Sequence, residues 1–571
     1  MAAPITDHGS REKYNTMDIY RELGVQIYKQ RESARPEKTA TFLNPKMRVN
    51  RELILLTLAV KVKCQGDDDI TSCLDAFSAS GVQALQWKKF LGKKVKVTAN
   101  DLKPEAVAGI NENCQLNGCD FQDYPETIQS EAVIETSCKN ANLLLHERSF
   151  QCIHLDPFGS SVNFLDAAFS NLPKDGILSV TSTDVSAFLG KCPQVTMRHY
   201  NGHVIKCEYQ PELACRLILA SLARAAARCH KGLEVLFAFA KEHFILTAVR
   251  VRRGYKKADE SLSQVRRLLH CNLCEERTFL KESLLAEDNL YKNLDCSCYK
   301  AHPGKTASLL GPVWSGSIFS QVFVDDMKTF SAEIPGISQE VRSILEKMSE
   351  ESRIGNQSSC NPDTDGKLQT LGKRKIDLDG ENDRKTRKQD SETADGGSTI
   401  PSADQKLEEK ITEGGSRGNA KDGKEERNNV WKPERTNITV TENISGTSVI
   451  GRGVMAETYS CSDKEKIKVA DTLTGVENKK PSVNKLKEEA KEKRDDNSKN
   501  DSSAQAMHTP FYFTVVKHCP NKGKWPRMKT VLDILKAKGH QAALTIFHHH
   551  GVRTTASLQQ YMQALQECSD S

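Results

Sequence analysis

The stretch LEVLFAFAKEHFILTAVRVRRG, residues 233–254, contains two apolar runs of strand length that are separated only by the residues KEH. Runs rich in Val, Leu, Ile and Phe are typical of buried strands. A crossover between parallel strands takes a dozen residues or more, so a three-residue connection predicts an antiparallel hairpin. This hairpin decides the fold, because the strands before it are expected to run parallel.

Upstream of the hairpin, strand-length apolar runs alternate with helical stretches. The expected strands occupy residues 70–77, 94–101, 131–138, 150–155 and 176–184. A long helix is predicted over residues 213–232, immediately before the hairpin. Strands that alternate with helices indicate β-α-β units, and hence a parallel sheet with helices on both faces. We therefore predict an α/β fold with a doubly wound sheet.

A doubly wound sheet whose last two strands form a hairpin resembles the Rossmann-like sheet of class I methyltransferases, which use S-adenosylmethionine. A dehydrogenase would more often carry G-x-G-x-x-G after its first strand. Here a single glycine, Gly81, follows the small residues SAS. A tight turn between strand and helix explains that glycine equally well.

Polar side chains follow the expected strands at the sheet edge where such folds bind their ligands. They are Asp75, Asp101, Asn140, Asp156 and Asp184. Each one alone is explained as the N-cap of a helix. Five such residues on one rim favour a binding site. Asp101 lies about twenty residues beyond the glycine turn, where a carboxylate can accept hydrogen bonds from ribose hydroxyls.

The tetrapeptide at Asp156, Pro157, Phe158 and Gly159 follows the fourth expected strand. An exocyclic base amine must shed a proton when it is methylated, because its lone pair is delocalised into the ring. A carboxylate and a backbone carbonyl held by proline can accept from that amine. The aromatic ring offers a stacking face, and the glycine permits close approach. The alternative is a turn capped by the aspartate; within this sheet we favour an amino-methyltransferase site.

Five motifs occur in order along the chain: FLNPKMRVNREL (42–53), LDAFSASGV (74–82), NDL (100–102), HLDPFGSSVNFLDAAF (154–169) and VTSTD (180–184). Together they resemble the tRNA guanine-N2 dimethyltransferase family, which modifies the guanosine at position 26. The form HLDPFG, together with LQW, RAAARC and KGLEVLFA, is most similar to the animal dimethyltransferase-like branch. The resemblance covers roughly residues 40–330 and 508–556.

The resemblance implies a role for each matching residue. Arg51 would contact the cofactor carboxylate, Asp101 the ribose, and Asn140 with Ala141 the adenine. Where this chain has Gln83 the family has Arg, and where it has Asn140 the family has Asp. The implied cofactor-binding residues are Phe42, Arg51, Asp75, Gly81, Gln83, Asp101, Asn140 and Ala141. The implied catalytic residues are Asp156, Pro157 and Phe158.

Two close pairs of cysteines, Cys271 with Cys274 and Cys296 with Cys298, suit a tetrahedral structural zinc ion. The alternative is four scattered buried cysteines. The family has a four-cysteine zinc site at the same place, which favours zinc. Three consecutive histidines, residues 548–550, are expected simply to face solvent.

The second half of the chain falls into two unlike parts. Residues 346–505 are rich in Ser, Asn, Asp, Glu, Lys and Gly with almost no aromatic residue, so we expect a disordered charged linker. Beyond it, an amphipathic helix ending at Gly539 is predicted. The expected organisation is an N-terminal extension (1–40), the methyltransferase domain (41–255), a zinc-binding first part (256–345) and second part (506–560) of one α+β tRNA-binding domain, and a tail (561–571).

Composition limits the surroundings and partners. The chain has 571 residues, a net charge of +6 and 18 cysteines, and it starts without an apolar leader. No run of 18 apolar residues is present, so no membrane association is expected. Basic clusters at 372–375 and 383–388 resemble a two-part nuclear localisation signal. Residues 1–40 contain no cysteine, so we expect a short form without the zinc fingers that some family members carry there.

Three hypotheses follow for function. The first is a tRNA methyltransferase that acts on N2 of a guanosine at or next to position 26, with S-adenosylmethionine and structural zinc as cofactors and tRNA as partner. The second is a catalytically weak or inactive relative that binds tRNA as an RNA chaperone, with Gln83 and Asn140 as its signs. The third is an amino-methyltransferase that acts on DNA or protein. No obligate protein partner is evident.

Overall fold

The computed structural model describes residues 17–30, 43–66, 69–123, 133–280, 289–302, 304, 306–355, 510–520, 523 and 525–570. These residues fall within one compact unit. Phe42, most of the expected linker and both basic clusters lie outside the described residues. Among the helices described, none is long and apolar enough to cross a membrane.

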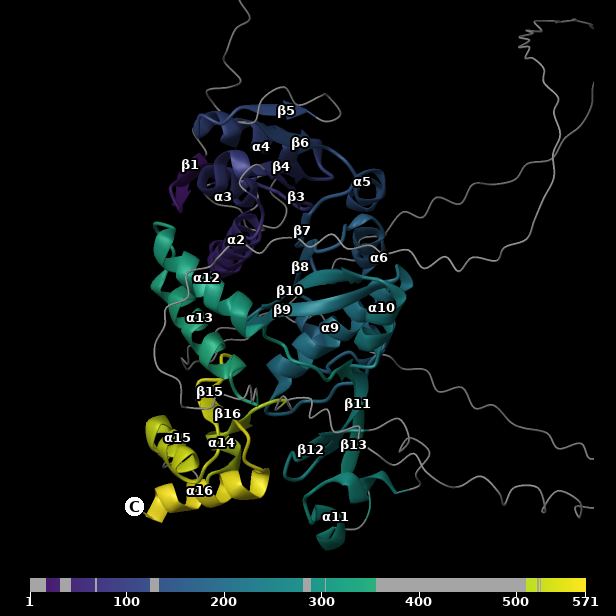
Figure 1. Ribbon diagram of the computed structural model, residues 1–571, viewed down its shortest axis with the longest axis vertical. Coiled ribbons are helices and arrows are strands. Elements are labelled where there is room, and N and C mark those ends of the chain that lie inside the picture. The colour runs from purple at the N-terminus through teal and green to yellow at the C-terminus, as the bar shows by residue number, and fades with distance from the viewer. Residues whose placement is uncertain are drawn as a thin grey trace, which may run out of the picture. The chain divides into compact units, whose positions relative to one another are not determined.

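An eight-stranded sheet forms the centre of the structure (Figure 1). Its order is β5-β6-β4-β3-β7-β8-β10-β9, and the paired strands run parallel except at β10. Strand β10 is antiparallel to both β8 and β9, so the predicted terminal hairpin is confirmed. The strands are β3 (Thr71–Asp75), β4 (Val95–Asn100), β5 (Phe121–Asp123), β6 (Ile134–Ser137), β7 (Cys152–Leu155), β8 (Ile177–Ser182), β9 (Lys231–Lys241) and β10 (Phe244–Arg253).

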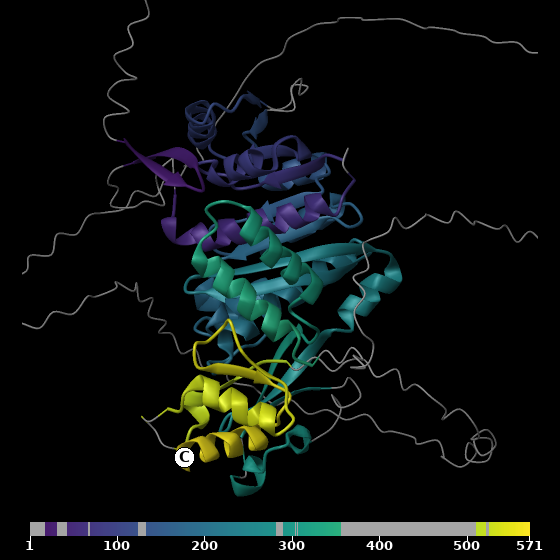
Figure 2. The same cartoon turned by 60° about the vertical axis from the view of Figure 1, so that its left-hand side comes forward.

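Two groups of helices cover the sheet, as Figures 1 and 2 show. Helix α2 packs against α3 and α12, and α12 packs against α13; in the other group α6 contacts both α5 and α9. Helix α4 also contacts β6. The helices are α2 (Arg48–Lys63), α3 (Val82–Leu91), α4 (Pro104–Leu116), α5 (Ala141–Glu147), α6 (Val162–Asn171), α7 (Val185–Phe188), α8 (Pro193–Tyr200), α9 (Gln210–Arg228), α10 (Tyr255–Leu262), α12 (Gln321–Glu333) and α13 (Gln339–Ser352).

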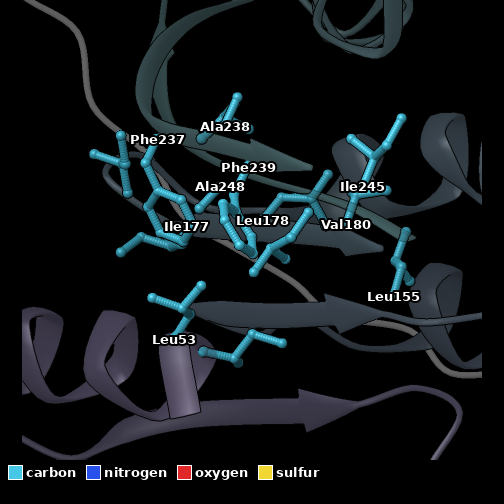
Figure 3. Packing of buried hydrophobic residues seen from close by; sticks show 14 of the residues in the cluster. Leu53, Leu155, Ile177, Leu178, Val180, Phe237, Ala238, Phe239, Ile245 and Ala248 are labelled. Atoms are coloured by element: carbon cyan, nitrogen blue, oxygen red, sulfur yellow. The ribbon is translucent and has the colours of Figure 1, made fainter. Parts of the chain in front are cut away.

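The hydrophobic core lies between the sheet and these helices. Figure 3 shows buried side chains of this core from α2 and from strands of the sheet, including Leu53 of α2, Leu178 of β8 and Phe237 of the edge strand β9. All three are fully buried. The whole of β8 is buried, as expected for a strand with helices on both faces.

A hairpin of β1 (Met17–Glu22) and β2 (Val25–Gln30) lies within the expected N-terminal extension. Val25 and Ile27 alternate along β2 and are buried, and Asn113 of α4 accepts a hydrogen bond from the Tyr28 N–H at 2.9 Å. The expected extension is therefore partly structured. The alternation involves only two buried residues, which is too short a pattern to predict a strand from the sequence.

The C-terminal part contains two small antiparallel sheets, with strand orders β12-β11-β13 and β14-β16-β15. The predicted amphipathic helix is α15, with Val531 and Leu535 fully buried. The elements of this C-terminal part are β11 (Val265–Cys271), β12 (Arg277–Phe279), α11 (Cys298–Ala301), β13 (Ala307–Trp314), β14 (Phe513–Thr514), α14 (Val515–His518), α15 (Met528–Ala537), β15 (Ala542–Leu544), β16 (Gly551–Thr554) and α16 (Leu558–Asp570).

Two expected boundaries fall inside helices. The linker was expected from residue 346, but α13 continues to Ser352 because Leu345, Met348 and Glu351 are buried on one helical face. The expected tail from residue 561 is part of α16, where Tyr561 and Leu565 are fully buried. Both helices are longer than their composition suggests because polar residues dominate their outer faces.

A buried network of charges joins segments on either side of the expected linker. Arg553 of β16 pairs with Glu212 of α9 at 2.7 Å and with Glu351 of α13 at 2.8 Å. Glu212 also pairs with Arg216 at 2.8 Å and accepts from the Phe511 N–H at 3.0 Å. The four charged side chains are fully buried, so each charge depends on its partners.

Replacing Arg553 with Met should destabilise the protein strongly, because it leaves Glu212 and Glu351 buried without their shared cation. Removing one partner of a buried pair commonly costs about 3–5 kcal/mol. Arg353→Met is the matched control, since Arg353 forms a half-exposed pair with Asp325 at 3.6 Å, a type worth about 0–1 kcal/mol. Denaturant unfolding checks this. Equal stability of the two variants would contradict it.

Candidate functional site

The carboxyl ends of five strands bring the predicted polar residues to one rim. Because β6, β4, β3, β7 and β8 are neighbours in that order, Asp75, Asp101 and Asp156 come together. The three carboxyl groups also interact electrostatically, since the charges of Asp156 and Asp101 raise the pKa of Asp75. Asn140 follows β6 and Asp184 follows β8 at the two flanks.

Asp75 is buried at the end of β3, with 3% of its surface exposed. Burial raises the pKa of this carboxyl to about 7, a hydrogen bond with Ser78 opposes the rise, and the neighbouring acids add to it. Its Oδ2 atom has no hydrogen-bond partner among the described residues. An unpaired buried acceptor costs free energy, so this atom is poised for a donor or a cation.

The turn after β3 brings the backbone close to the rim. Gly81 has φ +75°, and a Cβ there would meet Ile110 Cγ2 at 3.0 Å. Ala79 also has a left-handed backbone, and its N–H donates to Asp101 Oδ2 at 3.0 Å. Asp101 Oδ1 accepts from the Lys103 N–H at 3.0 Å. Asp101 therefore links the turn to the rim, and each of its oxygens retains a lone pair.

Asn140 is the N-cap of α5, which is the alternative to a binding role that the sequence left open. Its Oδ1 atom accepts from the Asn142 N–H at 2.9 Å and so caps α5. Asn140 is exposed, and its amide nitrogen has no partner among the residues described. Ala141 is buried as the first residue of that helix. A capped helix start and a free amide are compatible with an edge-on contact to a purine.

The loop after β7 presents an aromatic ring outward beside a partly buried acid. Burial raises the pKa of Asp156 to about 7, and the positive charge of Arg51 opposes that rise. Pro157 is buried, whereas Phe158 is 71% exposed. Gly159 donates to Thr183 Oγ1 at 2.9 Å, and its carbonyl accepts from the Thr183 N–H at 3.0 Å. These paired bonds fix the loop against the strand end at β8.

Two side chains of α8, outside the sequence motifs, contact this loop and the neighbouring strand end. Tyr200 of α8 donates to Ser160 Oγ at 3.0 Å, and Ser161 and Ser182 hydroxyls lie 2.9 Å apart. His199 lies 3.3 Å from Asp184. Sequence reasoning missed Tyr200 and His199, because they come from a helix with no strand-end position to mark them.

Arg51 forms a two-pronged ion pair that the sequence did not indicate. Its Nε and Nη2 atoms lie 2.7 and 2.6 Å from the two oxygens of Glu22 in β1, and Nη1 donates to the Asn44 carbonyl. Glu22 also accepts from Gln86 Nε2 and from Tyr20, each at 2.9 Å. Burial alone would raise the pKa of Glu22, but these bonds lower it.

Three of the five N–H groups of Arg51 are therefore already used, and two remain for a ligand carboxylate. The ion pair with Glu22 fixes the direction of the guanidinium. Gln83 is buried, and its amide donates to the Arg51 carbonyl at 3.4 Å. Gln83 thus supports α2 through one amide N–H, and its contact with the cofactor stays a prediction.

The four predicted cysteine ligands converge. The sulfur atoms of Cys271, Cys274, Cys296 and Cys298 all lie within 4.8 Å of one another. Backbone N–H groups of residues 273 and 274 hydrogen-bond to the Cys271 sulfur. A small apolar cluster that includes Leu269 surrounds them. A Zn–S distance of about 2.3 Å places tetrahedral sulfurs roughly 3.8 Å apart, so the group can close around one ion.

The sheet order and the acidic rim define the fold of a class I methyltransferase. The chain belongs to the family described as N2,N2-dimethylguanosine tRNA methyltransferase, which matches residues 24–360. The structure of Trm1 from Pyrococcus horikoshii with S-adenosyl-L-methionine is similar with a TM-score of 0.57 at 16% identity, over 96% of this chain and 99% of that one. That likeness shows the fold.

Named relatives agree with the family. A Macaca fascicularis tRNA (guanine(27)-N(2))-dimethyltransferase is 35% identical over 541 residues, which is 93% of this chain and 64% of that protein. A tRNA (guanine(26)-N(2))-dimethyltransferase of Methanothermobacter thermautotrophicus is 29% identical over 290 residues, 51% of this chain and 70% of that protein. The chain thus spans under two thirds of the macaque relative. These names give no support to the inactive alternative.

Asp156→Asn should stabilise the protein at pH 8 but not at pH 4. The pKa of Asp156 lies above its ordinary value of 3.8, so the folded state holds the proton more tightly and stability falls as pH rises toward 7. Asparagine avoids that loss, which we place at about 1 kcal/mol because solvent reaches the group. Melting curves at both pH values check this, with Asp166→Asn as an exposed control. A variant that melts below wild type at pH 8 would contradict it.

Proposed function

We propose that this protein transfers methyl groups from S-adenosylmethionine to N2 of a guanosine in tRNA. The observation that carries the proposal is the loop at Asp156, where a carboxyl with a pKa of about 7 lies beside an exposed Phe158 ring. Family membership supplies the reaction class. The same loop on an unrelated sheet would be only a turn.

The rim fits the cofactor on its own geometry. S-adenosylmethionine carries a sulfonium and an ammonium group, and the unpaired Oδ2 atom of Asp75 suits such a cation. Asp101 would accept hydrogen bonds from the ribose, and Arg51 would bind the carboxylate of the cofactor. Gly81 would let the backbone of the turn come close to the cofactor. The free amide of Asn140 would face the adenine. When bound, the cofactor supplies an electrophilic methyl group.

Asp156 would accept the proton that the guanine amine sheds. A carboxyl with a pKa of about 7 is about half ionised at neutral pH and is a stronger base than an ordinary aspartate. A nearby sulfonium charge would lower that pKa and favour the ionised form. The buried Pro157 fixes the backbone carbonyl, and Phe158 would stack on a guanine turned out of the helix.

The relatives' names refine the substrate. The macaque protein, similar over 93% of this chain, is named for guanosine 27, whereas the archaeal protein, similar over 51%, is named for guanosine 26. We therefore infer guanosine 27, next to the position first expected, and addition of two methyl groups. We also infer that zinc fills the four-cysteine cluster as a structural ion. The nuclear address remains a prediction.

Asp156→Ala should lower the single-turnover methylation rate by roughly 10²–10⁴-fold, the range for loss of a general base. Asp156→Asn should be nearly as slow, because an amide cannot take the proton. tRNA binding should persist, since phosphate contacts elsewhere dominate affinity. Asp166→Ala, an exposed acid on α6, should keep the wild-type rate. A folded Asp156→Ala protein within about threefold of wild type would defeat the assignment, since threefold lies far below that range.

Cys271→Ser with Cys274→Ser should release one zinc ion per chain and destabilise the sheet of β11 and β13, because metal binding is coupled to folding. Metal content measured by mass spectrometry and thermal melting check this. Cys64→Ser with Cys138→Ser, two exposed cysteines outside the cluster, should change neither. Wild-type protein without bound metal would contradict the zinc proposal.

A further inference from the structure

The three histidines expected to face solvent form a series of rings in contact, of which one pair is stacked and the others are tilted or edge-on. They lie in the turn between β15 and β16. The rings of His548 and His549 are stacked with centroids 4.8 Å apart, and those of His549 and His550 are 4.2 Å apart. Trp525 continues the series, with its ring 5.0 Å from that of His550. We call these four residues the ring ladder.

The ladder is open to solvent along part of its length. His549 is exposed, and Trp525 is 47% exposed. His548 Nδ1 accepts from the His550 N–H at 3.1 Å, so that nitrogen carries no proton. Large aromatic rings left on a surface are suited to stacking with a planar partner.

The turn that carries the three histidines of the ladder is held by several contacts. Phe547 is buried and stacks on Tyr512 with centroids 6.1 Å apart. Glu351 accepts from Thr545 Oγ1 at 2.6 Å and from the Ile546 N–H at 3.1 Å. The Gly551 N–H donates to the His548 carbonyl at 2.9 Å and closes the turn. Because the rings are already held in place, a ligand that stacks on them loses little free energy to ordering.

A cavity of about 450 Å³ adjoins the ladder at His548. Two lysines line it: Lys206 is exposed without a partner among the described residues, and Lys517 pairs with Glu275 at 3.2 Å. The acid Glu208 also lines the cavity, but it is paired with Arg277 at 3.0 Å and with His518 at 2.9 Å. Glu275 lines the cavity as well and is paired with Lys517, so Lys206 is the charged lining residue that the described residues leave unpaired, and its ammonium group favours an anionic ligand.

We propose that the ring ladder and this cavity bind one unpaired nucleotide of the RNA substrate, with its base stacked on Trp525 or His549 and its phosphate held by Lys206 and Lys517. Aromatic faces beside lysines are the combination that proteins use for unpaired nucleotides. A peptide would satisfy the charges but would leave the flat rings without a matching surface. This inference rests on the proposed function, because it names the part of the RNA that this surface recognises.

The test compares three variants of the full chain by fluorescence anisotropy with a tRNA transcript. Trp525→Ala with His549→Ala should weaken binding by about five- to 150-fold, the range that stacking of one base is worth. Trp525→Phe with His549→Phe keeps the rings and should bind within about threefold of wild type, below the range for a lost stack. Tyr255→Ala is the control, since Tyr255 is an exposed aromatic residue on α10 that does not line the cavity.

Salt dependence separates the two halves of the proposed site. Lys206→Ala with Lys517→Ala should reduce the slope of log affinity against log salt by about one to two, whereas the aromatic variant should keep the slope. An alanine pair at Trp525 and His549 that binds like wild type would overturn the proposal, as would a phenylalanine pair as weak as the alanine pair. Wild-type protein that binds no tRNA would instead overturn the proposed function.

Discussion

Arg553 lies between two buried carboxylates, Glu212 and Glu351, that come from parts of the chain far apart in sequence. A fully buried cation needs both partners, so this network ties the C-terminal segment to α9 and α13. That docking places β16 beside α9 and α13, and the histidine turn beside the cavity at Lys206. One guanidinium group therefore links β16 to both α9 and α13.

The acids at the rim of the sheet differ from those at Arg553, because among the described residues they are buried without a cation between them. Asp75 and Asp156 are held in surroundings that disfavour their charges, and Asp75 lacks a partner for one oxygen. Such a cluster of acids suits a cationic ligand, which a sulfonium cofactor is. Arg51 acts on Asp156 only as an opposing charge, because its Nε and Nη2 atoms are engaged by the two-pronged pair with Glu22. The hairpin that carries Glu22 therefore belongs to the site although it lies outside the sheet.

The sequence predicted what periodicity and strand ends encode. Asp75, Asp101 and Asp156 could be placed because each follows an apolar run, and the hairpin of β9 and β10 because its connection is short. The spacing of the four cysteines and the family resemblance together predicted that they form one cluster, which the structure shows. The pair of Arg51 with Glu22 and the network at Arg553 could not be foreseen, because contacts between distant polar residues leave no local pattern. The ring ladder could not be foreseen for the same reason, since Trp525 contacts His550 only in the folded chain.

The proposed transfer of methyl groups to N2 of a guanosine in tRNA can be measured directly. The most direct measurement incubates the purified full chain with S-adenosylmethionine and unmodified tRNA transcripts, then analyses the digested RNA by mass spectrometry. We expect N2,N2-dimethylguanosine in a fragment that maps to position 27, the position in the macaque relative's name. Absence of any methylated guanosine from a preparation that binds both S-adenosylmethionine and tRNA would contradict it.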